Sequence, residues 1–464
     1  MKLNNFSKLL LSAFVVVFIA SSCVKEGPMG QTGPAGKDGT NGADGKDANE
    51  TCKMCHSAAS VDLISTQYQF SKHEYGEAAF EESGNVGCTP CHAQEAFKYV
   101  VANKVPATFT KNATTGKWTN DYSTIASAAY GEIGCSTCHS SLHSTYGSAD
   151  IALTTVAPVS MTMWAGAKTI DLKADGGKSN LCVKCHQPRP FTNAIDGSIQ
   201  DYAAIAANPT GIMYDGNPSG ATNKIKPSYR THTHYGTVGA IYAGMGGVEF
   251  PGTEPYKNSA HTTVASCVDC HMGAKGGKSS LVGRAGGHTF KVRNSSDGTG
   301  LTSNTTWNLT TCNASGCHSA EITATTTNFW VNPRAEIKNL LNTLASKLTI
   351  NGVDILNRNP DASSNLWAGL TTNNYDGYLN VYDPITNPTM QANNPSSFQY
   401  VGTVPSSWSQ AQKDYNATLP KLTLTNAQFG ALINFQLCLR EYSLGIHNYA
   451  YTKALLKNSI AVLP

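Results

Sequence analysis

Apolar side chains recur at helical spacing only near the C-terminal end of this chain. From Arg334 to Leu348, apolar residues lie three or four positions apart, which is the pattern of one buried helix face. A second helical pattern runs from Thr425 to Leu463 and is interrupted near Gly445. Between them, the stretch from Pro360 to Pro420 is rich in Asn, Pro and aromatic residues, and it predicts a long covering loop or an insertion.

The chain between residues 52 and 318 lacks sustained helical or strand periods. It is rich in Gly, Ser, Thr and Asn, which favours short helices after each of the motifs described below, joined by long irregular loops. The fold class that this pattern predicts is mainly α, with extensive irregular loops and little β structure.

The N-terminal segment has the pattern of an export signal. Lys2 and Lys8 flank the start of an apolar run from Leu9 to Ile19, which is too short to span a bilayer. Residues 20–23, Ala-Ser-Ser-Cys, resemble a lipobox, in which Cys23 becomes the acylated first residue of the mature protein. We therefore expect a lipoprotein signal peptide over residues 1–22, with a plain cleaved signal as the alternative.

Glycine at every third position from 27 to 45 gives residues 23–48 a collagen-like pattern. A short run of Gly-X-Y triplets without dense proline makes a weak triple helix. An extended hydrophilic spacer behind the lipid anchor is therefore the favoured interpretation.

Cysteine use is the most informative feature of the composition. The 464 residues include 34 Lys+Arg and 31 Asp+Glu, a balance that does not indicate a nucleic-acid surface. Of the 14 cysteines, twelve fall into six close pairs, each followed directly by a histidine. Disulfide bonds give no reason for such a histidine after every pair.

Five of the pairs have the sequence Cys-x-x-Cys-His, which is typical of covalent haem attachment. Two thiols at this spacing can add to the vinyl groups on one edge of a porphyrin, while the adjacent imidazole binds the iron. Zinc is disfavoured because the pairs are too far apart to share one ion through short loops. The attachment cysteines are Cys52, Cys55, Cys88, Cys91, Cys135, Cys138, Cys182, Cys185, Cys267 and Cys270, and the proximal histidines are His56, His92, His139, His186 and His271.

A sixth motif has four residues between its cysteines, Cys312 and Cys317, and ends at His318. Asn313 and Gly316 favour a looped-out segment that still presents both thiols and the imidazole, so a sixth haem is expected. A local disulfide is the alternative. The last cysteine, Cys438, is expected to be a buried free thiol.

Histidines supply the second axial ligand that each haem iron needs. Seven remain beyond the motifs, so six irons leave one to spare. His232 and His234 are two residues apart and point to opposite sides if extended, so only one of them is expected to bind iron. Methionines 161, 163, 213, 245 and 272 compete as ligands but are not needed. The candidate distal ligands are His73, His143, His232, His234, His261, His288 and His447.

The stretch from Tyr229 to Phe290 contains THTHYG, AGMGGVEF, NSAHTTVASCVDCHM and GGHTF. It resembles multihaem cytochromes of the cytochrome c nitrite reductase and hydroxylamine oxidoreductase superfamily. The resemblance implies that His261 and His288 are distal ligands, and that the terminal helix carrying His447 returns a ligand to an earlier haem. The chain has no Cys-x-x-Cys-Lys motif like that of the nitrite reductases, and no tyrosine cross-linking signature can be placed in it.

Six haem c groups within residues 49–325 leave too little chain for a separate hydrophobic core around each. We expect the haems to form a stacked array at the centre of this domain. Residues 326–464 carry no haem motif, and are expected to pack over the array as a helical and loop region.

Histidine ligands on both iron faces predict an electron carrier rather than an enzyme. The partners would be other cytochromes or quinol-oxidising donors, and redox acceptors. The protein would be exported and lipid-anchored at the outer membrane, on its periplasmic or cell-surface face. One alternative is a reductase of nitrite, hydroxylamine or a similar small substrate, using Tyr229, Arg230 and the spare histidine as proton donors. Another is a homo-oligomer, a conductive filament in which a distal ligand crosses between copies.

Intact mass of the mature protein should show six covalently bound haems that survive acid-acetone extraction, because thioether bonds resist that treatment. The double substitution Cys312→Ser with Cys317→Ser should lower the count by one. A wild-type mass with five haems would indicate that Cys312 and Cys317 form a disulfide or remain thiols.

Overall fold

The computed structural model describes residues 61–75, 82, 85, 87–123, 131–140, 151–215, 225, 228, 231–273, 285–292, 312, 317–319, 328–358 and 375–464. These residues lie in one compact unit, Thr51–Pro464. The expected signal peptide and spacer lie outside the described residues, and so do Cys23, Cys52, Cys55, His56 and His143.

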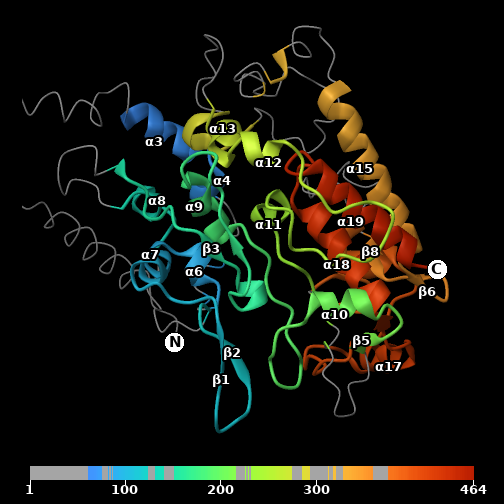
Figure 1. The fold of residues 1–464 in the computed structure, drawn as a ribbon. Helices are drawn as coiled ribbons and strands as arrows, with labels where there is room; N and C mark the ends of the chain where they lie inside the picture. Colours follow the sequence, from blue (N-terminus) through green and yellow to red (C-terminus); the bar gives the residue numbers. More distant parts are fainter. Residues whose placement is uncertain are drawn as a thin grey trace, which may run out of the picture. The chain divides into compact units, whose positions relative to one another are not determined.

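Three C-terminal helices pack against one another and form the largest helical part of the unit (Figure 1). They are α15 (Asn328–Lys347), α18 (Asn426–Arg440) and α19 (Tyr449–Val462). Nearly every side chain of α18 is buried, so this helix is central rather than amphipathic. The expected interruption near Gly445 is confirmed, because a loop separates α18 from α19 there.

Helix α15 begins six residues earlier than the apolar pattern predicts and includes Pro333. Pro333 is the sixth residue of the helix, so it removes one hydrogen bond, the one that its backbone nitrogen would donate to the residue four positions earlier. Trp330, in the added first turn, is buried. The expected apolar face is present, because Ile337, Leu341 and Leu344 are fully buried.

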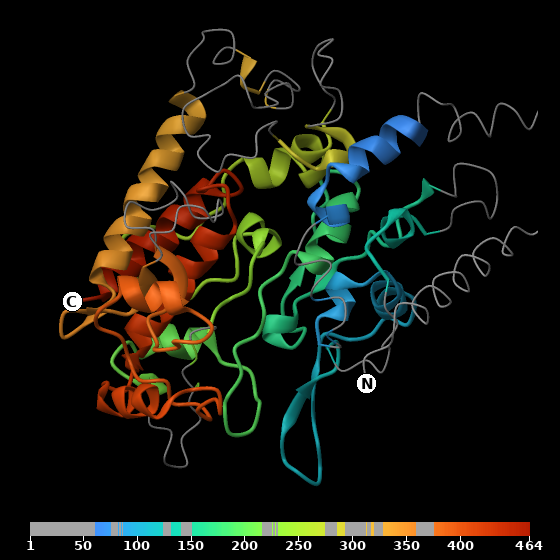
Figure 2. The same cartoon turned by 180° about the vertical axis from the view of Figure 1, so that it is seen from behind.

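The strands are short and form only two-stranded antiparallel sheets in the described part of the chain. Together with the many loops, this confirms a mainly α fold with little β structure. Figures 1 and 2 show the β1–β2 hairpin as a ribbon extending away from the neighbouring helices. The pairs are β1 (Phe109–Lys111) with β2 (Trp118–Asn120), β3 (Val159–Ser160) with β4 (Thr169–Ile170), β5 (Ile212–Asp215) with β10 (Thr423–Thr425), β6 (Thr349–Ile350) with β7 (Val353–Asp354), and β8 (Leu356–Arg358) with β9 (Tyr375–Leu379).

Short helices contain four of the cysteine motifs, and α7 (Gln94–Ala102) follows the second motif as the sequence predicted. Two cysteines three positions apart span about one helical turn, so the motif itself forms the turn. The motif helices are α6 (Thr89–His92), α8 (Cys135–Cys138), α9 (Lys178–Cys185) and α13 (Cys267–His271). The others are α3 (Val61–Gln69), α4 (Lys72–Tyr75), α7 (Gln94–Ala102), α10 (Tyr202–Ala207), α11 (Val238–Tyr242) and α12 (His261–Val264), with the 3₁₀ turns η3 (Thr162–Trp164) and η4 (Gly287–Thr289).

The stretch from Pro360 to Pro420 is more regular than the expected covering loop. It contains the buried strand β9, α16 (Pro388–Asn393) and α17 (Gln410–Thr418). A strand that is buried on both faces shows no alternation of apolar and polar residues, so its sequence pattern does not predict a strand. Helix α17 does have a start signal, the capping box of Ser409 and Gln412, in which each side chain bonds the other's backbone N–H.

The main hydrophobic core draws on α15, α18, α19 and segments between residues 159 and 250. Among the described motif helices, only α9 contributes to it, through Val183. Cys438 lies in this core as a fully buried free thiol, as expected, and Met161 and Met163 are buried there too. No helix in the described ranges is both long and apolar enough to cross a bilayer.

Asn434 joins α18 to the segment before the fifth motif. Its side-chain amide accepts a hydrogen bond from the Val248 backbone N–H at 2.8 Å and donates one to the Val248 carbonyl at 2.8 Å. It also donates to the Ser459 hydroxyl of α19 at 2.8 Å. The asparagine is fully buried, so water does not compete for these hydrogen bonds.

Asn434→Ala should lower the free energy of unfolding by about 2–4 kcal/mol, because it leaves buried Val248 groups without their partner. Urea unfolding of the holoprotein followed by circular dichroism measures this. Asn339→Ala, on the exposed face of α15, is the matched control and should cost less than about 0.5 kcal/mol. Equal unfolding midpoints for the two variants would show that Asn434 contributes nothing.

Candidate functional site

Four of the described motifs present their histidine by the same backbone closure. The backbone N–H of the histidine donates to the carbonyl of the first cysteine, at 2.9–3.0 Å in the second, third and fourth motifs. In the expanded sixth motif, the His318 N–H donates to the Cys312 carbonyl at 3.0 Å. The two extra residues of this motif therefore leave the closure between its ends unchanged.

Five motif histidines each face a histidine from a distant part of the chain. Their ring centres lie 6.0–6.4 Å apart in every case. No pair joins two motif histidines. The pairs are His92 with His234, His139 with His288, His186 with His73, His271 with His447, and His318 with His261.

This spacing fits one metal ion between two imidazoles. A metal–imidazole bond is about 2 Å long, and the ring centre lies about 1 Å beyond the bound nitrogen. Two rings on opposite faces of one ion therefore have their centres about 6 Å apart. With attachment cysteines next to one ring of each pair, the residues fit a haem iron held between two histidines.

His234 and His232 differ in what their rings face. The His234 ring lies 6.0 Å from His92 with the planes 10° apart. The His232 ring instead contacts Tyr235 and Tyr378, at centroid distances of 5.2 and 5.6 Å. His234 has a φ of 91°, in the left-handed region that is unfavourable for a residue with a side chain. Such strain is often kept at functional positions, and here it accompanies the ring that faces His92.

Backbone carbonyls orient several of these rings through the ring nitrogen Nδ1. An imidazole that donates from Nδ1 has Nε2 free to bind a metal, so the carbonyl fixes both tautomer and ring plane. The bonds run from His139 to the Ile151 carbonyl at 2.8 Å, from His186 to Gly236 at 3.1 Å, from His261 to Ile446 at 3.1 Å and from His271 to Phe290 at 2.8 Å.

His447 donates to a carboxylate instead. Its Nδ1 lies 2.5 Å from Oε2 of Glu441, which is fully buried. Burial alone would raise the pKa of Glu441, but hydrogen bonds from His447, Ser443 and Gly445 outweigh it and hold the pKa below its usual value. Glu441 is not among the residues predicted from the sequence. The sequence shows only that a carboxylate lies six residues before the candidate ligand His447.

Burial keeps several of the paired imidazoles neutral, which is the form that binds a metal. Desolvation is the largest cause that lowers the pKa of His73 to about 4, and the nearby His186 and His271 lower it further. Desolvation likewise lowers the pKa of His271 to about 4, and that of His234 to about 3.

The fourth motif lies at the centre of the described motifs. Its Cys185 thiol hydrogen-bonds Cys91 of the second motif, and its Cys182 thiol hydrogen-bonds Cys267 of the fifth. Helix α9 accordingly packs against both α6 and α13. These two hydrogen bonds are the main reason why the pKa of Cys182 and Cys185 is raised, followed by burial, and a smaller contribution from Cys138 places the third motif nearby.

Phe290 connects three of the histidine pairs. Its ring lies 4.9 Å from His73 and 5.9 Å from His288, each measured between ring centres. Its backbone carbonyl accepts the hydrogen bond from His271. Phe290 has a φ of 54°, so the backbone turns sharply where these three contacts meet. In the sequence, Phe290 is only the last residue of the segment GGHTF, which does not indicate these contacts.

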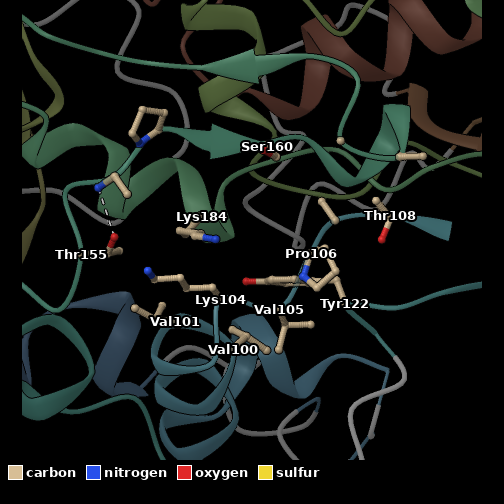
Figure 3. A pocket seen from close by; sticks show the side chains of 15 residues that line it. Val100, Val101, Lys104, Val105, Pro106, Thr108, Tyr122, Thr155, Ser160 and Lys184 are labelled. Atoms are coloured by element: carbon tan, nitrogen blue, oxygen red, sulfur yellow. Dashed lines mark hydrogen bonds between the residues drawn. The ribbon is translucent and has the colours of Figure 1, made fainter. Parts of the chain in front are cut away.

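A cavity of about 330 Å³ lies beside the second and fourth motifs. Figure 3 shows Tyr122, Lys104 and Lys184 lining it, and the Tyr122 hydroxyl is buried without a hydrogen-bond partner among the described residues. The charges of Cys91 and Cys185 act on Tyr122, although burial is the main reason why its pKa is raised. No histidine lines the cavity, so it does not open onto an imidazole of the described pairs.

Comparison with known proteins gives one match, to a part of the chain. Residues 100–282 match the family model described as Cytochrome c552. This segment contains the third, fourth and fifth motifs. No curated protein matches the chain, and no solved structure matches it. The match covers less than half of the chain, and together with the motifs it supports a c-type cytochrome with haem c as its cofactor.

His234→Ala should expose one haem iron, because it removes the ring that faces His92. Electron paramagnetic resonance should then show one high-spin ferric haem per molecule, and the reduced protein should bind one carbon monoxide. His232→Ala is the matched control and should leave both signals as in the wild type. The reverse result for the two variants would assign the ligand to His232.

Proposed function

We propose that this multihaem c-type cytochrome carries six haem c groups and transfers electrons between other redox proteins. The observation that supports this most directly is the set of five histidine pairs, each with ring centres 6.0–6.4 Å apart. A haem iron cycles between its ferric and ferrous states, and two fixed histidine ligands let it do so without binding a substrate.

The proposed axial pairs join each motif histidine to one distal ligand. In the described part of the chain they are His92/His234, His139/His288, His186/His73, His271/His447 and His318/His261. His56 and His143 are the remaining motif and non-motif histidines apart from His232, so we propose them as the sixth pair. In this assignment His232 is the histidine that binds no iron.

Contact between motifs supports electron transfer within the chain. The thiols of Cys91 and Cys185 meet, and so do those of Cys182 and Cys267. Haems attached at these cysteines would have their edges close together, which suits transfer from one iron to the next. The second, fourth and fifth motifs would then form one continuous conductor, with the third motif close to the fourth.

We further propose that the protein is exported and held at the outer membrane by a lipid on Cys23, with residues 23–48 as a hydrophilic spacer. The support is the sequence pattern of the first 48 residues. Such a tether would let the haem domain meet soluble or membrane-bound redox partners. A quinol-oxidising cytochrome as donor, and an extracellular or periplasmic acceptor, fit this position.

A reductase of nitrite or a related small substrate is the second candidate, and the family match favours it. That function requires an iron with one open face and nearby proton donors. The five described pairs place imidazoles on both sides of each proposed iron, and the cavity lined by Lys104 and Lys184 has no histidine in its wall. An open iron would therefore have to belong to the first motif.

Electron paramagnetic resonance of the oxidised protein should show only low-spin ferric haem, and the reduced protein should bind little carbon monoxide. His447→Ala serves as the positive control, since it should convert one haem to a high-spin, carbon-monoxide-binding form without loss of haem. A wild-type high-spin signal near one haem per molecule, together with turnover of nitrite or hydroxylamine, would replace the carrier function with the reductase.

A further inference from the structure

The Glu441 carboxylate is enclosed by donors from the loop that follows α18. Its Oε1 accepts the backbone N–H groups of Ser443 at 3.1 Å and Gly445 at 3.0 Å. Its Oε2 accepts the Ser443 hydroxyl at 2.6 Å and Nδ1 of His447 at 2.5 Å. The residue is 1% exposed, so water does not compete for these bonds.

Backbone strain shows that the loop is built around this carboxylate. Tyr442 and Leu444 have φ values of 62° and 56°, in the left-handed region that side chains disfavour. Both flank Ser443, which donates twice to Glu441 and accepts the His447 backbone N–H at 3.1 Å. The bonds to Glu441 therefore stabilise a strained loop conformation, and in this conformation the His447 ring lies beside His271.

We propose that Glu441 is a positioning residue that makes the iron between His271 and His447 more reducing than it would be if both ligands donated only to backbone carbonyls. This inference rests on the proposed ligation by His447. It adds a residue that neither the motifs nor the family match assigns.

The reason lies in the strength of the hydrogen bond at Nδ1. A bond from an imidazole N–H to a carboxylate is charge-assisted and about twice as strong as one to a neutral carbonyl. It draws the Nδ1 proton toward Glu441 and makes Nε2 a stronger electron donor to the metal. A stronger donor stabilises ferric over ferrous iron, so the reduction potential falls.

The same chain supplies an internal comparison. The Nδ1 atoms of His139, His186, His261 and His271 all donate to backbone carbonyls, which carry no net charge. His447 alone among the described rings with a recorded Nδ1 acceptor has a carboxylate there. His447 therefore differs from these four ligands in the charge beside its ring, and its partner His271 is one of the four with a carbonyl.

Redox titration of the holoprotein, followed by visible and electron paramagnetic resonance spectra, tests the proposal. Glu441→Gln keeps the size and an acceptor oxygen but removes the charge. It should raise one haem potential and leave the others in place, with every haem still low-spin. Ser443→Ala removes a competing donor from Oε2, so it should shift the same potential in the opposite direction.

Glu336→Gln is the matched control, because Glu336 lies on α15, bonds Tyr449 and Lys453, and contacts no described imidazole. It should leave all potentials unchanged. A Glu441→Gln variant in which no haem potential rises would overturn the proposal. A high-spin haem in that variant would also overturn it, by showing that Glu441 only holds the loop together.

Failure of the proposed function gives a different result. If His447→Ala leaves the wild-type spectrum unchanged, then His447 is not a ligand and the ligation itself is wrong. If His447→Ala opens one iron but Glu441→Gln moves no potential, the ligation stands and only the role of Glu441 is rejected.

Discussion

The fixed distance between two imidazole rings is the constraint on which the rest of this structure depends. Each of the five described pairs joins residues that are far apart in sequence, and each spacing falls between 6.0 and 6.4 Å. The short turn of a motif fixes the position of only one imidazole ring in each pair. The other ring must come from a segment whose position is fixed by packing elsewhere, so the chain needs a rigid frame outside the motif helices.

The C-terminal helices provide that frame. Helix α18 is buried almost throughout, and the loop after it carries both His447 and the Ile446 carbonyl that orients His261. The Arg440 carbonyl at the end of α18 accepts the Gly236 N–H, and the Gly236 carbonyl in turn orients His186. A region without any haem motif thus controls imidazoles of three different pairs, which explains why so much apolar chain follows the last motif.

The sequence supplies the candidate histidines but not the way in which they pair. Motif histidines follow from local chemistry, and counting supplies the distal candidates, but a count cannot tell His234 from His232. That choice depends on a φ of 91° at His234 and on the direction of His92, which are products of tertiary packing. The role of Glu441 also depends on tertiary structure, because its carboxylate meets His447 only when the strained loop between them has folded.

Spatial order among the motifs departs from sequence order, and this bears on how electrons would travel. The fourth motif touches the second and the fifth through its own two thiols, so it lies at a branch rather than at one step of a linear series. Phe290 contacts His73, His288 and His271, which are proposed ligands of three different irons. An iron of low potential beside His271 would lie next to this branch. Cys312 of the sixth motif lies near Cys270 of the fifth. A low-potential iron at the fifth motif would therefore slow transfer toward the sixth and favour exchange among the second, third and fourth, so the charge on Glu441 would act on the route as well as on one site.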